Sequence, residues 1–385
     1  MEHTLRFRVL TPLYSGGLSA PTRPTLRLSH IRGMLRFWLR ALAGGAYRAA
    51  DSAVFGARGI PSGARISLEC DRFEPSGMRS ADEGLAYIGH GLQRRKAIPP
   101  ETEFSLRVSF SNGVDERARR LFYAAVGGLV LLGGLGARWR RGFGALRLLS
   151  VEPTGGAADV LSGLETGTDG FIPRFRRLMD EASDAVADME REETTPSVSL
   201  TDEGAELCVF NSDYDRAERA LGHIGSLLRS FRDHNRSRIA RKDHDLIYGY
   251  ARANKIDNVP LRAVFGMPHH YFLRDVGGGV SVSVTFEPAS YSRGVTRRAS
   301  PLLLSVVPLA EGRCTIACAL FRGQFLPRSV PIQVSGFRQV QRKKERLPTK
   351  VLGRHPSWQA AIGLMDRLIS SGEFTPVELN RRKEG

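Results

Sequence analysis

The chain has 385 residues, 42% of them hydrophobic, and carries a formal net charge of +16 with a pI near 10.3. This length allows two or three domains with a sizeable core, and the charge indicates a polyanionic partner, nucleic acid before an anionic membrane. No stretch approaches the about 20 apolar residues that a membrane span needs, and residues 1–8 have no hydrophobic signal core. We therefore expect a cytoplasmic protein with no membrane association.

The four cysteines, Cys70, Cys208, Cys314 and Cys318, form no Cys-x-x-Cys pair and no zinc spacing with histidine. We interpret them as small buried residues in a reduced protein, and Cys314 and Cys318 share one face if they lie on a strand.

The charge changes sign twice along the chain. Residues 1–150 hold 23 Lys and Arg against 11 Asp and Glu, residues 151–205 hold 4 against 13, and residues 206–385 hold 29 against 16. The net charges of these blocks are thus +12, −9 and +13. This pattern predicts an N-terminal domain at 1–151, an acidic linker at 152–205 and a C-terminal domain at 206–385.

Residues 1–151 read as a β-α-β-β-α-β succession. The predicted elements are strands at 4–10, 64–70, 104–110 and 143–151 and helices at 29–42 and 115–132. This order predicts a ferredoxin-like domain, an antiparallel four-stranded sheet with two helices on one face, which is also the arrangement of common RNA-recognition modules.

The predicted helix at 29–42 has two distinct faces. Its apolar stripe, which should pack in the core, is Ile31, Leu35, Trp38 and Leu42. Another face carries Arg32, Arg36 and Arg40, and no acidic residue lies between Glu2 and Asp51. We predict that these arginines bind RNA phosphates; the alternatives are a solvated basic face and ion pairs within the protein or at a subunit interface.

A loop from Gly134 to Gly144 joins the second predicted helix to the last strand. It holds four glycines, three arginines and a tryptophan: Gly134, Gly136, Gly142, Gly144, Arg138, Arg140, Arg141 and Trp139. Glycine lets a backbone approach a ligand closely, arginine matches phosphate oxygens, and tryptophan offers a stacking face. We predict that this loop binds RNA, with a flexible basic turn as the alternative.

The C-terminal half repeats a similar mixture of elements with insertions. Strands are predicted at 206–210, 280–286, 302–307 and 313–321, and helices at 171–187, 213–233, 237–255 and 357–370. We interpret residues 206–385 as a second ferredoxin-like copy decorated with extra helices and loops. Arg297 and Arg298 are its predicted RNA-binding residues.

Signatures of several enzyme classes are missing from the sequence. It has no dinucleotide fingerprint, phosphate-binding loop, His-Glu-x-x-His or Gly-x-Ser-x-Gly motif. Asp243, His244 and Asp245 are helical neighbours that point in different directions, which makes a metal site improbable. We expect no catalytic residue, no metal and no cofactor, and therefore no enzyme.

The glycine pattern resembles the signature loop of the RAMP superfamily of CRISPR-associated RNA-binding proteins. The stretches 11–17 and 31–40, the latter with Arg-Gly-x-x-Arg-Phe-Trp, are similar to the first-numbered subunit of the type III-B (Cmr) effector complex, and so are 297–302 and 321–327. Residues 152–205 are not covered, and Leu39 stands where an aromatic residue is expected.

This resemblance implies an α+β protein with two RAMP domains and no nuclease centre. It implies a role in antiviral defence as a subunit that binds the 3′ part of the guide (CRISPR) RNA and helps capture target RNA beside the other type III-B subunits. The alternative is a metal-independent, guide-processing endoribonuclease of the same superfamily, with His30 or Tyr14 acting on a 2′-hydroxyl.

Overall fold

A computed structural model describes residues 2–16, 23–78, 82–194, 196–201, 203–289, 295–341 and 343–379. The chain divides into two compact units. Unit 1 comprises Met1–Leu227, Leu303–Gly323 and Leu368–Gly385, and unit 2 comprises Leu228–Leu302 and Gln324–Arg367. Within the described ranges, no helix is long and apolar enough to cross a membrane.

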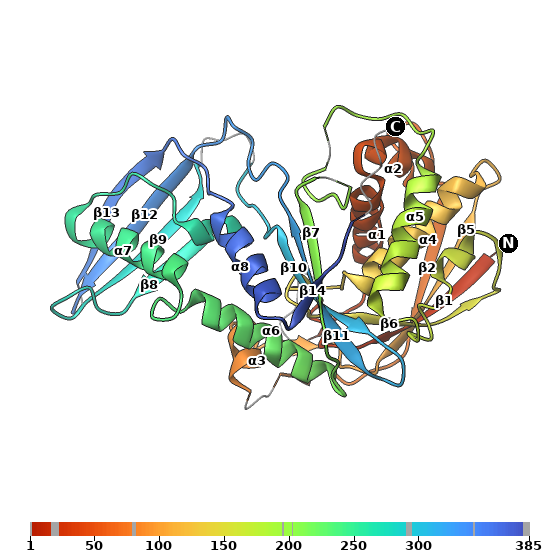
Figure 1. The fold of residues 1–385 in the computed structure, drawn as a ribbon, viewed down its shortest axis with the longest axis horizontal. Helices are drawn as coiled ribbons and strands as arrows, with labels where there is room; N and C mark the ends of the chain where they lie inside the picture. The colour runs from red at the N-terminus through yellow and green to blue at the C-terminus, as the bar shows by residue number, and fades with distance from the viewer. Residues whose placement is uncertain are drawn as a thin grey trace. The chain divides into compact units, whose positions relative to one another are not determined.

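Unit 1 begins with the predicted ferredoxin-like fold (Figure 1). Its elements are β1 (Glu2–Val9), α1 (Leu28–Ala43), β2 (Ala64–Cys70), β5 (Glu103–Phe110), α4 (Glu116–Leu131) and β6 (Leu146–Glu152). The strands are ordered β2-β5-β1-β6, and β1 runs antiparallel to both β5 and β6. The β-α-β-β-α-β prediction is therefore confirmed. Short elements fill the connections: α2 (Tyr47–Phe55), β3 (Ser76–Gly77), α3 (Glu83–Ile88) and β4 (Lys96–Ala97).

Helix α1 packs against α4 through the predicted apolar stripe, all of which is buried. Trp38 is fully buried because two glycines of the α4 region make room for it. A Cβ atom at Gly128 would lie 3.1 Å from the Trp38 ring, and one at Gly133 would lie 2.6 Å from its Nε1 atom. The helix begins at Leu28, one residue before the predicted start.

A second ferredoxin-like succession follows in the C-terminal half. Its elements are β7 (Ala205–Phe210), α6 (Ala217–Arg232), β10 (Leu302–Pro308), β11 (Cys314–Phe321), α8 (Gln359–Ser370) and β14 (Phe374–Pro376). The strand order, β10-β11-β7-β14, repeats the order of the first sheet when strands are matched by their place in the succession. The predicted duplication is thus present, and this sheet lies in unit 1 with the first.

The acidic segment 152–205 is folded and belongs to unit 1, so it differs from the predicted linker. It forms η2 (Gly156–Leu161) and α5 (Phe171–Ala185), and α5 packs on α4 (Figure 1). Phe175 and Leu178 of α5 share a hydrophobic core with Leu207 and Phe321 of the second sheet. Helix α5 is amphipathic, with Asp180 and Asp184 exposed opposite the buried Phe175 and Leu178, and the acidic composition of the segment concealed this helix.

Unit 2 consists mainly of two insertions in the second copy. The first, between α6 and β10, holds α7 (Arg238–Ala253), η3 (Leu261–Phe265), β8 (His269–Leu273) and β9 (Val280–Pro288); the second, between β11 and α8, holds β12 (Ile332–Val340) and β13 (Lys343–Leu352). Together they form a sheet ordered β13-β12-β9-β8. The predicted decoration by helices and loops is therefore incomplete: β9 was predicted as a strand at 280–286, but β8, β12 and β13 were missed.

Three of the four cysteines are buried as expected. Cys318 lies opposite Cys208 in the β11–β7 ladder, and burial raises the pKa of the Cys318 thiol well above its ordinary value. Cys70 ends the edge strand β2 and is exposed, so the prediction was wrong for this residue.

Candidate nucleic-acid interface

The loop from Gly134 to Gly144 is held by the chain that follows β1. The Ala137 amide donates to the Tyr14 carbonyl at 2.7 Å, and the Gly144 amide donates to the Pro12 carbonyl at 3.2 Å. The buried Thr11 hydroxyl donates to the Gly142 carbonyl at 2.7 Å. The loop is therefore a fixed part of the fold.

The glycines are required by contacts inside the protein. Gly136 has a φ of +88°, and a Cβ atom there would lie 2.6 Å from the Tyr14 carbonyl oxygen. Gly144 has a φ of +67°, and its Cβ would lie 1.9 Å from the Leu135 carbonyl oxygen. The amides of Gly136, Gly142 and Gly144 each have an intramolecular acceptor. These contacts, and not close approach to a ligand, account for the glycines.

Arg138 points into the protein. Its guanidinium donates to the carbonyls of Ile88 and His90, and burial lowers its pKa. Its backbone has a φ of +62°, a conformation that is unusual for a residue with a Cβ atom. Arg138 thus ties the loop to the end of α3, and this geometry gives no support to its predicted role in RNA binding.

Trp139 and Arg140 lie against α1. The Trp139 ring meets Phe37 edge to face, with centroids 5.2 Å apart. The Arg140 guanidinium lies 4.9 Å from the Trp139 ring centroid and 5.4 Å from that of Phe37. Trp139 is half-buried in this stack, and its stacking on a base stays a prediction.

The same loop contacts the second ferredoxin-like sheet within unit 1. The Leu304 amide of β10 donates to the Arg140 carbonyl at 3.1 Å, and Arg141 pairs with Leu304 in a parallel bridge. A Cβ atom at Gly142 would lie 2.9 Å from Leu221 of α6. The loop therefore has a structural role that the sequence did not reveal.

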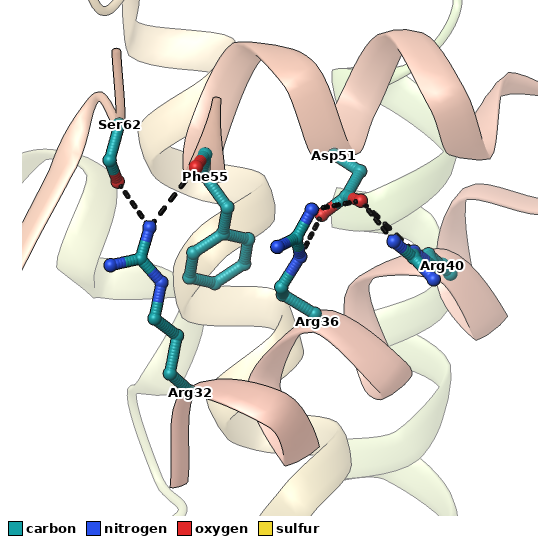
Figure 2. Close-up of polar contacts among 6 residues, drawn as sticks. All are labelled: Arg32, Arg36, Arg40, Asp51, Phe55 and Ser62. Carbon is teal, nitrogen blue, oxygen red and sulfur yellow. Dashed lines mark hydrogen bonds and ion pairs between the residues drawn. The ribbon is translucent and has the colours of Figure 1, made fainter. Parts of the chain in front are cut away.

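The arginine row of α1 faces α2 (Figure 2). Arg36 makes two hydrogen bonds of 2.8 Å to the Asp51 carboxylate, and Arg40 binds the same carboxylate. These bonds to Asp51 raise the pKa of Arg36. Arg32 donates to the Phe55 carbonyl at 3.1 Å and to the Ser62 hydroxyl at 2.8 Å. Asp51 is buried, and sequence reasoning missed its role because its partners lie 15 and 11 residues away.

Arg36, Arg40 and Arg140 nevertheless line a common surface pocket of about 540 Å³. Its other lining residues are Gly33, Phe37, Pro196, Ser197 and Val198. The side chains of Arg36 and Arg40 are 34% and 43% exposed although both bind the buried Asp51 carboxylate, and Arg140 adds a third guanidinium group to the lining. Its volume lies within the range of about 300–1,000 Å³ that is usual for ligand pockets.

The pocket has the components that a nucleotide requires. Guanidinium groups bind phosphate oxygens, Phe37 supplies an aromatic ring, and Gly33 exposes the surface of α1, with no atom within 4 Å of a Cβ placed there. The structure thus brings together three of the six arginines predicted in this half of the chain. The contribution of residues 196–198 was missed because they were assigned to a linker.

Arg297 and Arg298 belong to unit 2. Arg297 is exposed, whereas the Arg298 guanidinium lies 5.6 Å from the Phe325 ring centroid and its burial lowers its pKa. The backbone of Arg298 pairs with that of Met267. Their binding to RNA stays a prediction.

The residues considered for acid–base chemistry are built into the fold. The Tyr14 hydroxyl is buried, and burial raises its pKa to about 12. Burial also lowers the pKa of His30, whose Nε2 atom faces the Gly136 amide at 3.4 Å. Asp243 accepts hydrogen bonds from the amides of Leu261 and Arg262 and from the Tyr271 hydroxyl. Among the residues that the structure describes, no cluster of His, Cys, Asp and Glu could hold a metal ion.

Residues 6–147 match the family model of the RAMP superfamily. This range holds the first ferredoxin-like copy up to the start of β6 and includes both α1 and the glycine loop. The predicted resemblance to the RAMP superfamily is therefore confirmed for residues 6–147. Comparison with curated protein sequences finds no match.

Solved structures extend the likeness to the whole chain. The chain is similar to apo Cmr1 from Pyrococcus furiosus, with a TM-score of 0.59 and 17% sequence identity over 98% of both chains. It is also similar to a chain of the type III-B Cmr-beta complex bound to cognate target RNA and AMPPnP in the presence of ssDNA, with a TM-score of 0.50 and 12% identity over 83% of this chain and 95% of that one. At these identities the likeness shows a shared fold.

Proposed function

We propose that this protein is a non-catalytic RNA-binding subunit of a type III-B CRISPR ribonucleoprotein effector complex. In this role it binds the 3′ part of the guide RNA and helps capture target RNA, beside the other subunits, in antiviral defence. The observation that carries the proposal is the pocket where Arg36, Arg40 and Arg140 converge beside Phe37. The family match, the fold shared with Cmr1 and the net charge of +16 support it.

The pocket suggests how phosphates are held. Asp51 fixes the guanidinium groups of Arg36 and Arg40, so little side-chain entropy remains to be lost when a phosphate binds. Arg140 is oriented by its stack on Phe37 and Trp139. Contacts of this kind read the backbone and not the bases, so binding should be weakly sequence-specific and strongly salt-dependent.

The test is the affinity of the full-length protein for guide RNA as a function of salt. The Arg36→Ala/Arg140→Ala variant should lower the affinity about tenfold or more at low salt and decrease the slope of log K against log[salt] by about 1 to 2. The control is Arg107→Ala/Arg117→Ala, which removes two arginines whose exposed partners are Glu69 and Asp188. Equal losses of affinity in both variants would be explained by net charge and would contradict RNA binding at the pocket.

The guide-processing endoribonuclease is tested separately. Purified protein incubated with repeat RNA in EDTA should leave the RNA intact if the subunit is non-catalytic. A discrete cut that His30→Ala abolishes would overturn the proposal. The burial of Tyr14 and of the His30 ring gives that alternative no support.

A further inference from the structure

The sheet of unit 2 has one covered face. Helix α7 lies over it: the Tyr271 hydroxyl donates to Asp243 at 2.9 Å, and Arg338 of β12 donates to the Ala251 carbonyl. On β9, Val284 and Phe286 are buried on this side. Side chains alternate along a strand, so the remaining residues point to the opposite face.

The opposite face carries two exposed aromatic rings in one row. The ladder places Phe272 of β8 opposite Ser283 of β9, and Ser283 opposite Phe337 of β12. Phe272 is 59% exposed and Phe337 is 40% exposed. Of the large hydrophobic side chains that are strongly exposed in the described ranges, all but Ile60 lie on this sheet. Two phenyl rings in register on an open sheet are a patch that needs an explanation.

The side chains beside the two rings are short or polar. Ser283 lies between the rings, and His270 bonds to the hydroxyls of Thr285 and Ser283 at 2.9 and 3.1 Å. An apolar protein partner would find few apolar contacts here. A base stacked on either ring would instead find hydroxyl and imidazole groups that can bond to its edge.

The edge of this face is basic. Arg346 of β13 pairs with Phe337, and the Lys344 ammonium lies 4.1 Å from the Phe337 ring centroid. By the ladder register, Lys344 and Arg346 are the described basic residues of the β12–β13 hairpin that lie on the open face. Aromatic rings bordered by cations are complementary to a strand of bases joined by phosphates.

From these observations we propose that the open face of this sheet is a second RNA-binding surface, which takes single-stranded RNA. Bases stack on Phe272 and Phe337, and Lys344 and Arg346 bind the adjoining phosphates. Neither ring can reach a base that is paired and stacked inside a duplex, so the surface selects unpaired RNA. The proposal adds a surface in unit 2 to the pocket in unit 1 and stands whether or not that pocket binds guide RNA.

The test uses full-length protein and a fluorescein-labelled oligouridylate, with a hairpin RNA of equal length for comparison. Binding is measured for Phe272→Ala/Phe337→Ala, for Phe272→Trp/Phe337→Trp, and for the control Ile60→Ala/Val340→Ala, which removes exposed apolar groups outside the row. The same set is measured with Arg36→Ala/Arg140→Ala, so that binding at the pocket does not mask a loss. Photo-crosslinking of 4-thiouridine RNA, read by mass spectrometry, locates the contact.

The alanine variant should lose about fivefold or more in affinity for each ring removed, the tryptophan variant should keep wild-type affinity, and the control should be unchanged. Crosslinks should fall within 269–273 and 335–339. Unchanged affinity in the alanine variant, together with no crosslink to either segment, would overturn the proposal and leave a protein partner as the occupant of this face. A loss of affinity in Arg36→Ala/Arg140→Ala alone supports only the pocket. A loss in Phe272→Ala/Phe337→Ala alone supports only this sheet.

Discussion

Unit 1 and the open sheet of unit 2 use their charged and aromatic residues in opposite ways. In unit 1, Arg138 is bound to backbone carbonyls and Arg36 is bound to a buried carboxylate. In unit 2, Phe272 and Phe337 stand exposed on a sheet with cations at its edge. A residue that the sequence predicts to bind RNA can therefore stabilise the fold instead. The exposed rings of unit 2, in contrast, were not predicted from the sequence.

The largest difference between the two units should appear in the stability effect of removing an aromatic ring. Trp38→Ala removes a fully buried indole that packs on Gly128 and should lower the free energy of unfolding by about 3–5 kcal/mol. Phe272→Ala truncates an exposed ring and should change it by less than about 0.5 kcal/mol. Denaturant unfolding followed by circular dichroism measures both. A comparable loss for Phe272→Ala would mean that this ring is part of a packed core.

The second largest effect on stability is expected at Asp51, whose carboxylate binds Arg36 and Arg40. Asp51→Ala leaves two guanidinium groups without their shared anion and should destabilise the protein by about 2–4 kcal/mol. The control is Glu69→Ala, which breaks the exposed pair with Arg107 and should cost less than about 1 kcal/mol. Equal effects on the thermal midpoint would contradict the assignment of Asp51 as a buried anchor.

A third pair of variants separates scaffold from ligand contact within the loop. Arg138→Ala leaves the Ile88 and His90 carbonyls without their donor and should cost about 1–3 kcal/mol in stability, with the affinity for RNA unchanged at a temperature where the variant is folded. Arg140→Ala should weaken RNA binding about fivefold, with a smaller change in stability. The reverse result would move the RNA contact from the pocket to the end of α3.

The smallest effect concerns pH. Burial lowers the pKa of His3, His30 and His223, so in unit 1 the neutral rings are favoured in the folded state. The unfolded chain therefore binds more protons below about pH 6.5, and stability should fall as the pH drops from about 7 to about 5. His30→Gln should lessen this fall, as read from thermal midpoints across the pH range. An unchanged pH profile would mean that the His30 ring is solvated.

Much of the fold could be predicted because unit 1 follows simple periodic patterns. The stripe of α1 and the alternation of β5 are both borne out in the buried residues. The sheet of unit 2 was missed in part because β13 reads Lys-Lys-Glu-Arg-Leu-Pro-Thr-Lys-Val-Leu, with charges and a proline in place of alternation. Charged residues and proline are typical of edge strands, which conceals such a strand in the sequence.

The candidate site was harder to predict than the fold. The sequence located α1 and the glycine loop, but the partner of each arginine depends on contacts across the tertiary structure. Asp51 is an example: it was noted as the end of an acid-free stretch, and the fold makes it the anion that holds Arg36 and Arg40. Gly136 of the loop is explained by the Tyr14 carbonyl, a contact that no local pattern could indicate.

The central claim is that this chain binds RNA through the pocket of unit 1 within a type III-B complex. A crosslinking map of the assembled complex, with 4-thiouridine in the guide RNA, tests it most directly. The account predicts crosslinked peptides from residues 33–40 and 139–141, which are lost in the Arg36→Ala/Arg140→Ala variant. Crosslinks confined to other subunits, with both segments of this chain unmodified, would contradict it.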